Sequence, residues 1–115
     1  MTITLYGIPN CDTVKKARTW LDTRGIAYAF HDYKKQGADP ARIAGWIAQA
    51  GVGKVVNKAG TTFRKLSPED QAALEGEGAP EVLAANPSVI KRPIVEHPGG
   101  LLVGFKEPEW AAALA

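Results

Sequence analysis

The sequence predicts an α/β domain in which strands open and close the chain and helices fill the middle. Three observations predict this class. A strand–helix–strand pattern opens the chain, capped helical segments follow over roughly residues 38–87, and two apolar runs separated by Pro-Gly-Gly precede a last helix. The 115 residues suit one domain, and 45 % hydrophobic with 23 % charged residues is a globular composition.

The opening elements are a strand, a helix and a second strand. The run "ITLYGI" at residues 3–8 is rich in strand-forming residues, and Pro9 with Asn10 ends it. A helix is expected from Asp12 to a stop at Gly25, because apolar residues recur at helical spacing, at Val14, Ala17 and Leu21. The run "IAYAFHDY" predicts the second strand. The short crossover predicts that the two strands are parallel.

Three capped helices are expected in the middle. In "ADPARIAGWIAQAG" Asp39 is the N-cap, Pro40 the first helical residue and Gly51 the terminator. "SPEDQAALEG" repeats this pattern with Ser67 as the cap. "APEVLAANP" predicts a third short helix that ends before Pro87. The basic segment "VVNKAGTTFRKL", between the first two helices, is predicted to be irregular.

The chain is expected to end with a hairpin and a helix. "RPIVEH" and "LLVGF" flank "PGG", which indicates two antiparallel strands joined by a turn, and "EPEWAAALA" predicts a terminal helix. The order βαβ, three helices, ββα matches a thioredoxin-like frame with a helical insertion. We therefore predict a single domain over residues 1–115, with the insertion at roughly residues 38–87.

Charge and composition exclude several classes of function. The net charge of +2, from 14 basic and 12 acidic side chains, is too small to predict binding to nucleic acid or to a membrane surface. No apolar stretch approaches the ~20 residues of a membrane span. The start "MTITLYGIPN" lacks the basic and apolar regions of a secretory signal. With one cysteine in the chain, these features predict a reducing, cytoplasmic location.

Three kinds of functional site are not predicted, because the sequence lacks residues that each requires. "AGVGKVV" lacks the first glycine and the final Ser or Thr of a phosphate loop of the Walker A type. A low-molecular-weight phosphatase would have arginine six residues after the cysteine, where this chain has Ala17. Without a second cysteine or a histidine pair at ligand spacing, no metal site is predicted.

Cys11 is the remaining candidate for a catalytic residue. It comes directly before the first predicted helix, where unpaired backbone N–H groups and the helix dipole favour an anion and lower a thiol pKa. Lys15 can add positive potential, and Thr13 can offer a hydroxyl to the sulfur. The alternative is a small buried filler, but Pro9 and Asn10 favour a surface loop.

Two arginines are further candidates. Arg64 lies in the irregular basic segment, and Arg92 comes just before a predicted strand. The bond between Arg92 and Pro93 is a candidate for a cis peptide. A surface arginine is usually only solvated. Arg64 and Arg92 can therefore belong to a functional site only if the fold brings them to Cys11.

The segments "LYGIPNCDTVKKAR", "NKAGTTFRKL" and "IKRPIV", in this order, resemble the arsenate reductase (ArsC)-like family. The YffB-type reductase-like branch is the most similar, and the Spx-type regulators are related. The resemblance covers essentially the whole chain and implies a thioredoxin-like fold with an inserted helical subdomain. It implies that Cys11 is the nucleophile, that Arg64 and Arg92 bind an anion, and that Pro93 is a cis-proline.

The sequence departs from the family in two places. Arsenate reductases of this class have a third arginine after the late glycine, whereas Gly104 is followed here by Phe105 and Lys106. This departure puts arsenate reduction in doubt, because lysine lacks the bidentate fork of arginine even if Lys106 substitutes in part. Many Spx-type regulators have a second cysteine three residues after the first. Val14 holds that position here, which excludes a switch based on an intramolecular disulfide.

The leading interpretation is a thiol reductase that uses Cys11 alone. The resemblance implies glutathione as co-substrate, with glutaredoxin as a possible protein partner, and no tightly bound cofactor is expected. The alternatives are a regulator that binds RNA polymerase without the redox switch, an arsenate reductase, and a family site that has lost efficient turnover. The sequence leaves the natural substrate and the oligomeric state open.

Overall fold

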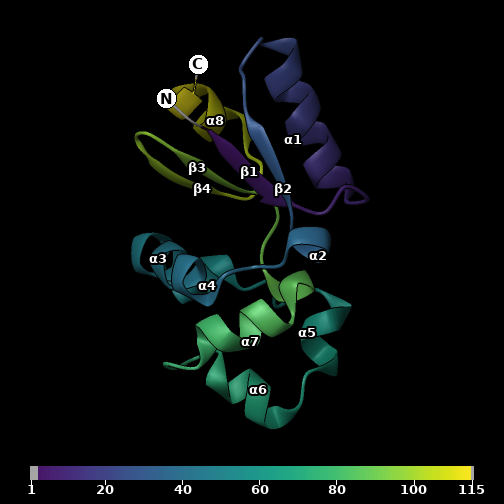
Figure 1. Ribbon diagram of the computed structural model, residues 1–115, viewed down its shortest axis with the longest axis vertical. Coiled ribbons are helices and arrows are strands. Elements are labelled where there is room, and N and C mark those ends of the chain that lie inside the picture. The colour runs from purple at the N-terminus through teal and green to yellow at the C-terminus, as the bar shows by residue number, and fades with distance from the viewer. Residues whose placement is uncertain (1–2, 115) are drawn as a thin grey trace. The chain divides into compact units, whose positions relative to one another are not determined.

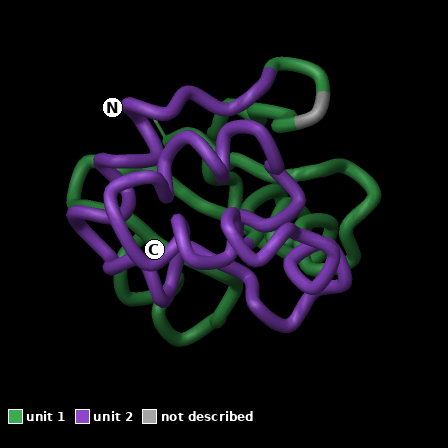
Figure 2. The backbone as a smooth tube through the Cα atoms, turned by 90° about the horizontal axis from the view of Figure 1, so that it is seen from below, with its two compact units in different colours: residues 1–36, 92–115 green, residues 37–91 purple. Residues whose placement is uncertain are grey.

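The computed structural model describes residues 3–114 and divides the chain into two compact units (Figure 2). Unit 1 joins the residues up to Gln36 to those from Arg92 onward, and unit 2 comprises Gly37–Lys91. The chain passes between the units twice, at residues 36–37 and 91–92. The prediction of a single domain over residues 1–115 stays a prediction.

Unit 1 contains a four-stranded sheet in the order β2-β1-β3-β4 (Figure 1). β1 and β2 are parallel, as predicted from their short crossover, and β3 pairs antiparallel with both β1 and β4. The β3–β4 hairpin turns at Pro98 and Gly99, as predicted. The elements of unit 1 are β1 (Thr4–Gly7), α1 (Asp12–Thr23), β2 (Ala29–Asp32), α2 (Tyr33–Gln36), β3 (Ile94–His97), β4 (Gly100–Val103) and α8 (Glu107–Leu114).

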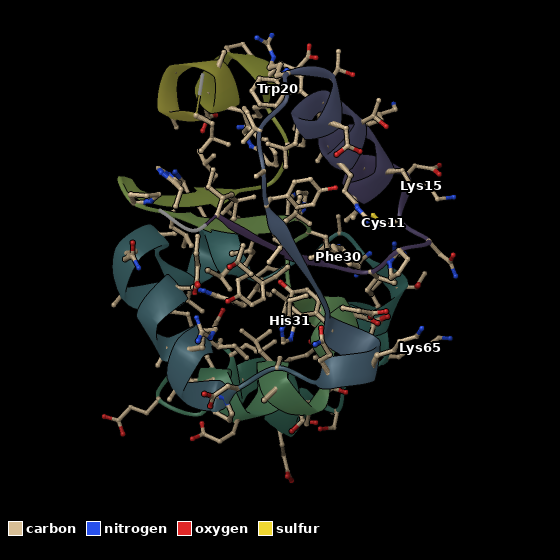
Figure 3. All side chains as sticks on the ribbon, turned by 45° about the horizontal axis from the view of Figure 1, so that its top comes forward. Cys11, Lys15, Trp20, Phe30, His31 and Lys65 are labelled. Carbon is tan, nitrogen blue, oxygen red and sulfur yellow. The ribbon has the colours of Figure 1, made fainter. Side chains whose placement is uncertain are left out.

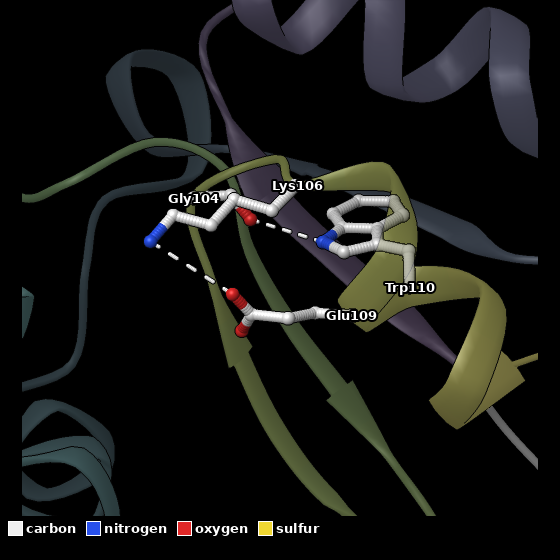
Figure 4. Close-up of polar contacts among 4 residues, drawn as sticks. All are labelled: Gly104, Lys106, Glu109 and Trp110. Carbon is white, nitrogen blue, oxygen red and sulfur yellow. Dashed lines mark hydrogen bonds and ion pairs between the residues drawn. The ribbon is translucent and has the colours of Figure 1, made fainter.

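One face of this sheet forms the core of unit 1. Side chains alternate between the faces of a strand, so Leu5, Val95 and Leu102 share one face. They pack against the apolar side of α1 and against Trp110 of α8. The indole Nε1 of Trp110 also donates a hydrogen bond to the carbonyl of Gly104 over 3.0 Å, which fixes α8 to the end of β4 (Figure 4).

Unit 2 is helical, and its helix starts follow the predicted capping. The side chain of Asp39 accepts a hydrogen bond from the N–H of Ala41, and Ser67 Oγ accepts one from the N–H of Asp70. Among the described residues, the elements of unit 2 are α3 (Pro40–Ala50), α4 (Val52–Val55), α5 (Thr61–Lys65), α6 (Pro68–Ala73), α7 (Ala79–Ala85) and the 3₁₀ helix η1 (Pro87–Val89).

Some short elements differ from the sequence prediction. The segment predicted to be irregular, residues 55–66, contains the helix α5, and α2, α4 and η1 were not predicted at all. None of these exceeds five residues, so none is long enough to display a helical period. The predicted last residue of α8, Ala115, lies outside the described residues.

The element order confirms the predicted fold class. The strands, α1 and α8 of unit 1 form the thioredoxin-like frame, and the helices of unit 2 are inserted between α2 and β3. Over residues 3–114, no helix has the length and apolar character needed to cross a membrane.

Candidate functional site

Cys11 lies at the N-terminus of α1, in the turn that follows β1 (Figure 3). Its N–H donates to the carbonyl of Ile8, and its own carbonyl accepts the first helical hydrogen bond, from the N–H of Lys15, over 2.9 Å. Its backbone is extended, as an N-cap requires. The side chain is half-buried against the edge of the unit 1 core, so the sulfur is neither a core filler nor fully solvated.

The pKa of the Cys11 thiol is set by opposing influences. Burial is the largest and raises the pKa, but hydrogen bonding from the backbone of Val14, the Arg92 side chain and the backbone of Thr13 lowers it, as does the charge of Arg92. The net result is a pKa below the ordinary value. Although Sγ makes no capping hydrogen bond of standard geometry, the start of the helix and Arg92 together favour the thiolate.

Sheet register explains how Arg92 reaches this cysteine. β1 and β3 are antiparallel with Thr4 opposite Glu96 and Tyr6 opposite Ile94. Because the strands are antiparallel, the end of β1 that leads to Cys11 lies beside the start of β3, which Arg92 and Pro93 precede. The peptide bond between Arg92 and Pro93 is cis, as predicted. Pro93 is buried, and its carbonyl accepts a hydrogen bond from the N–H of Gly104 over 2.8 Å.

A buried polar cluster, which the sequence interpretation missed, lies on the sheet face opposite the unit 1 core. The hydroxyl of Tyr6 donates to Glu96 Oε1 over 2.9 Å, and the Tyr6 and Tyr33 rings stack with centroids 6.3 Å apart. Burial raises the pKa of Tyr33 well above its usual range, while the charge of Arg92 opposes that rise. Arg92 therefore acts on Cys11 and on Tyr33. The tyrosine follows β2 in a helix too short to be recognised from sequence.

The other predicted residues occupy different places. Asn10, Thr13 and Lys15 are exposed in the turn and the first turns of α1. Thr13 acts on the sulfur through its backbone, while roles for its hydroxyl, for Asn10 and for Lys15 stay predictions. Arg64 is exposed on α5 of unit 2 and donates from Nη2 to the carbonyl of Ala59 over 3.2 Å. Its approach to Cys11 also stays a prediction.

The segment after β4 is built for packing. The Phe105 ring meets Trp110 edge to face, with centroids 4.8 Å apart. Lys106 is exposed, and its Nζ lies 3.8 Å from Glu109 Oε2 (Figure 4). The residue after Gly104 is thus an aromatic side chain held against α8.

Val14 comes three residues after Cys11, on the inner side of α1. Its side chain is fully buried in the unit 1 core. Within residues 3–114, no cluster of three or more His, Cys, Asp or Glu side chains is arranged to hold a metal ion.

Two curated proteins are similar to this chain over most of its length. The chain is 45 % identical over 113 residues to an uncharacterized protein of Haemophilus influenzae, covering 98 % of this chain and 99 % of the relative. It is 28 % identical over 109 residues to the global transcriptional regulator Spx of Listeria innocua, covering 93 % of this chain and 82 % of the regulator.

Solved structures of related proteins are also similar to this chain. A YffB protein is 54 % identical, with a TM-score of 0.94, and the match covers 99 % of this chain and 100 % of that one. An arsenate reductase (ArsC) related protein of Brucella melitensis is 46 % identical, with a TM-score of 0.74, covering 97 % and 93 % of the two chains. The profile of the ArsC family matches residues 6–113, nearly the whole sequence. This chain belongs to the ArsC family.

Proposed function

We propose that the protein is a glutathione-dependent thiol reductase that works in a reducing compartment and in which Cys11 is the nucleophile. The observation that carries the proposal is the place of Cys11 at the N-terminus of α1, where the backbone of the first turn and the Arg92 side chain lower the pKa of its thiol. The thiolate, and not the thiol, is the form that attacks disulfides. The family supports chemistry at this position, because it includes reductases of the arsenate type.

The first step forms a mixed disulfide. The Cys11 thiolate attacks the glutathione sulfur of a glutathione mixed disulfide. The sulfur–sulfur bond of the substrate breaks, the other thiolate leaves and takes a proton from solvent, and Cys11 carries glutathione. The positive charge of Arg92 next to the sulfur favours the attacking anion.

The second step needs an external thiol, because the chain has no other cysteine. The thiolate of a second glutathione attacks the glutathione sulfur of the adduct, which releases oxidised glutathione and restores the Cys11 thiolate. Overall, one glutathione thiol is consumed: the substrate sulfur is reduced to a thiol, and the glutathione that it carried leaves joined to the second glutathione as oxidised glutathione. We assign Arg92 and Arg64 to the glutathione carboxylates, which match the fork of a guanidinium.

Intact-mass measurement of the adduct tests this proposal. Purified protein is incubated with oxidised glutathione, and a mass increase of one glutathione on Cys11 is expected. Arg92→Ala and Arg64→Ala are each expected to reduce the rate of adduct formation. The exposed neighbours Lys91→Ala and Lys65→Ala are the matched controls and should react at the wild-type rate.

A chain that stays unmodified under mildly oxidising glutathione contradicts the reductase. An adduct that forms equally fast in all four variants contradicts the arginine roles alone. Turnover is then measured as glutathione oxidation coupled to reduction of a glutathione mixed disulfide, with Cys11→Ser as the inactive control.

A second candidate function is binding to RNA polymerase, which the similarity to Spx favours. The buried Val14 removes the disulfide switch but not a binding surface. Specific retention of core RNA polymerase by Cys11→Ser protein, without reductase turnover by the wild type, would favour the regulator. Retention by neither protein would remove this candidate.

Arsenate reduction is the weaker enzymatic alternative. Phe105 packs against Trp110 at the position of the third arginine, and Lys106 lies by Glu109 instead. The oxyanion would therefore have one guanidinium fewer than in arsenate reductases of this class. Phe105→Arg is the informative variant, because a gain of arsenate turnover would identify this position as the limiting one.

A further inference from the structure

An open groove of ≈ 1100 Å³ lies in unit 1 between α1 and the segment that enters α8. Its α1 side runs from Thr13 to Arg24, and its opposite side is formed by Phe105, Glu107 and Pro108. Trp20 also lines the groove. The reductase mechanism proposed above uses none of these side chains.

The apolar part of the groove is formed by packed aromatic rings. Trp20 is only 7 % exposed and meets Trp110 edge to face, with centroids 5.8 Å apart. Phe105 packs against both tryptophans. The guanidinium of Arg24 lies 4.3 Å above the Trp20 ring. This surface is fixed by its own packing, so an apolar side chain can bind there without first ordering the groove.

The charged part of the groove is mostly positive. Three exposed cations, Lys15, Lys16 and Arg24, line it against one acidic residue, Glu107. Oppositely charged ligands are attracted to such a surface and bind in a preferred orientation. The groove thus favours an acidic occupant with one apolar side chain.

The length of the groove favours a protein segment over glutathione itself. Thr13 and Arg24 are eleven residues apart on a helix, which corresponds to about 16 Å. Five extended residues span that distance at about 3.3 Å each, whereas a tripeptide spans about 10 Å. Thr13 lies in the first turn of the helix that Cys11 caps, so the groove begins at the end of α1 that carries the reactive cysteine.

We propose that this groove selects protein substrates whose glutathionylated cysteine is joined to an acidic segment of about five residues with one apolar side chain. This inference rests on the proposed reductase function. The segment lies along α1, with its acidic residues at the lysines and Arg24 and its apolar side chain against Phe105, which the buried Trp20 supports from below. The Cys11 thiolate then takes the glutathione from the substrate cysteine, which leaves as a thiolate and takes a proton from solvent.

Synthetic peptides test the selection. Each carries one glutathionylated cysteine next to a five-residue segment that is either Glu-rich with one Leu or Lys-rich with one Leu. In the first pair of peptides, the Glu-rich or Lys-rich segment precedes the cysteine. In the second pair, it follows the cysteine. We expect the better Glu-rich peptide to react about tenfold faster than its Lys-rich partner, with the difference shrinking as salt rises. The rate of adduct formation on Cys11 is measured by intact mass.

Arg24→Glu separates the groove from the chemistry. Arg24 lies at the far end of α1 from Cys11, so this variant should react with tail-free oxidised glutathione at the wild-type rate. It should lose most of the preference for the Glu-rich peptide. Lys54→Glu, the same reversal at an exposed lysine of unit 2, should keep it.

The outcomes separate the two proposals. No adduct with any probe, oxidised glutathione included, removes the reductase and this inference with it. Equal rates for acidic and basic peptides, with a normal glutathione adduct, overturn the inference alone. Slower reaction of Arg24→Glu with tail-free oxidised glutathione also overturns it, because glutathione itself would then occupy the groove.

Discussion

At the N-terminus of α1, the half-buried sulfur of Cys11 lies among groups that shift its pKa in opposite directions. Burial alone would raise the pKa of Cys11. The backbone of the first helical turn and the Arg92 side chain reverse that effect. Since Arg92 also acts on the buried Tyr33, its guanidinium is shared between the reactive side of the site and the polar cluster behind it.

Replacing Arg92 with methionine is expected to raise the pKa of Cys11 toward the free value of about 8.5. Methionine keeps much of the side-chain volume but removes the charge and the hydrogen bond. The pKa is measured from the pH dependence of alkylation by iodoacetamide. Lys91→Met is the control and should leave the midpoint unchanged; an unchanged midpoint in Arg92→Met would show that the helix alone activates the thiol.

Stability supplies an independent check with a defined sign. Because the pKa of Cys11 is lower in the folded protein, the thiolate stabilises the fold fully only above the unfolded pKa of about 8.5. That stabilisation is lost as the pH falls through the folded pKa. The free energy of unfolding of the wild type, minus that of Cys11→Ser, should therefore increase with pH. In the Arg92→Met background, the same difference between the proteins with and without Cys11 should increase less.

The sequence predicted part of this site at the residue scale. Cys11 was identified because it directly precedes a helical pattern, and the cis bond at Pro93 because proline comes before a strand. The contact between Arg92 and Cys11 depends on pairing between strand residues about 90 positions apart in the chain, which spacing cannot reveal. The polar cluster was missed because Tyr6 and Tyr33 resemble ordinary strand residues.

At the scale of elements, a close approach between β1 and α1 holds the start of the helix in place. A Cβ atom added at Gly7 would lie 2.9 Å from Val14 Cγ2, which is too close. Val14 is also fully buried, so it has little room to move. Glycine therefore lets the helix pack directly on the strand that leads to Cys11.

Gly7→Ala is expected to destabilise the fold by about 1–3 kcal/mol, because the added methyl overpacks the contact. It should also slow the alkylation of Cys11, since α1 must shift. Both effects are measured, by urea denaturation and by alkylation rate. Gly45→Ala is the control. A Cβ atom added at Gly45 in α3 would meet nothing within 4 Å outside the backbone of its own helix, so alanine should stabilise the protein by about 0.5–1 kcal/mol.

A double variant shows whether the contact itself is responsible. Val14→Ala opens a cavity and is destabilising alone, but it removes the atoms that a methyl at position 7 would meet. Gly7→Ala combined with Val14→Ala should therefore cost less than the sum of the single changes. Additive costs would show that position 7 acts on the strand rather than on the helix.

The sequence described most elements well and the shortest ones poorly. The caps at Asp39 and Ser67 predicted helix starts correctly, because a side-chain oxygen, proline and a helical run gave three agreeing signals. The segment around Arg64 gave no such signal and was predicted to be irregular, although it contains α5. Short helices of this kind are formed by their surroundings and not by local preference.

At the scale of the whole molecule, the reactive site uses the first residue after the helical insertion. The segment before Arg92 is bonded within unit 2, where the N–H of Lys91 donates to the carbonyl of Val55 over 2.7 Å. Arg92 then begins the second part of unit 1. The site therefore depends on folding of the insertion, if the two units unfold together.

Cooperative unfolding of the two units is testable because tryptophans report on them separately. Trp20 and Trp110 lie in unit 1 and Trp46 in unit 2, so fluorescence of Trp46→Phe protein follows unit 1 alone. In that background we add Ile43→Val, which removes one fully buried methyl group from unit 2. For one cooperative domain, the unit 1 signal should lose about 1 kcal/mol of unfolding free energy in urea.

The control for this measurement is Gln49→Ala, an exposed position on the same helix, which should leave the transition within about 0.5 kcal/mol. A unit 1 transition that ignores Ile43→Val would mean that the units unfold independently and that the sequence-based prediction of one domain is wrong. Alkylation of Cys11 across the same urea series connects stability to the site. If the insertion holds Arg92 in place, thiolate reactivity should fall in step with the unit 1 signal, and Ile43→Val should move both midpoints together.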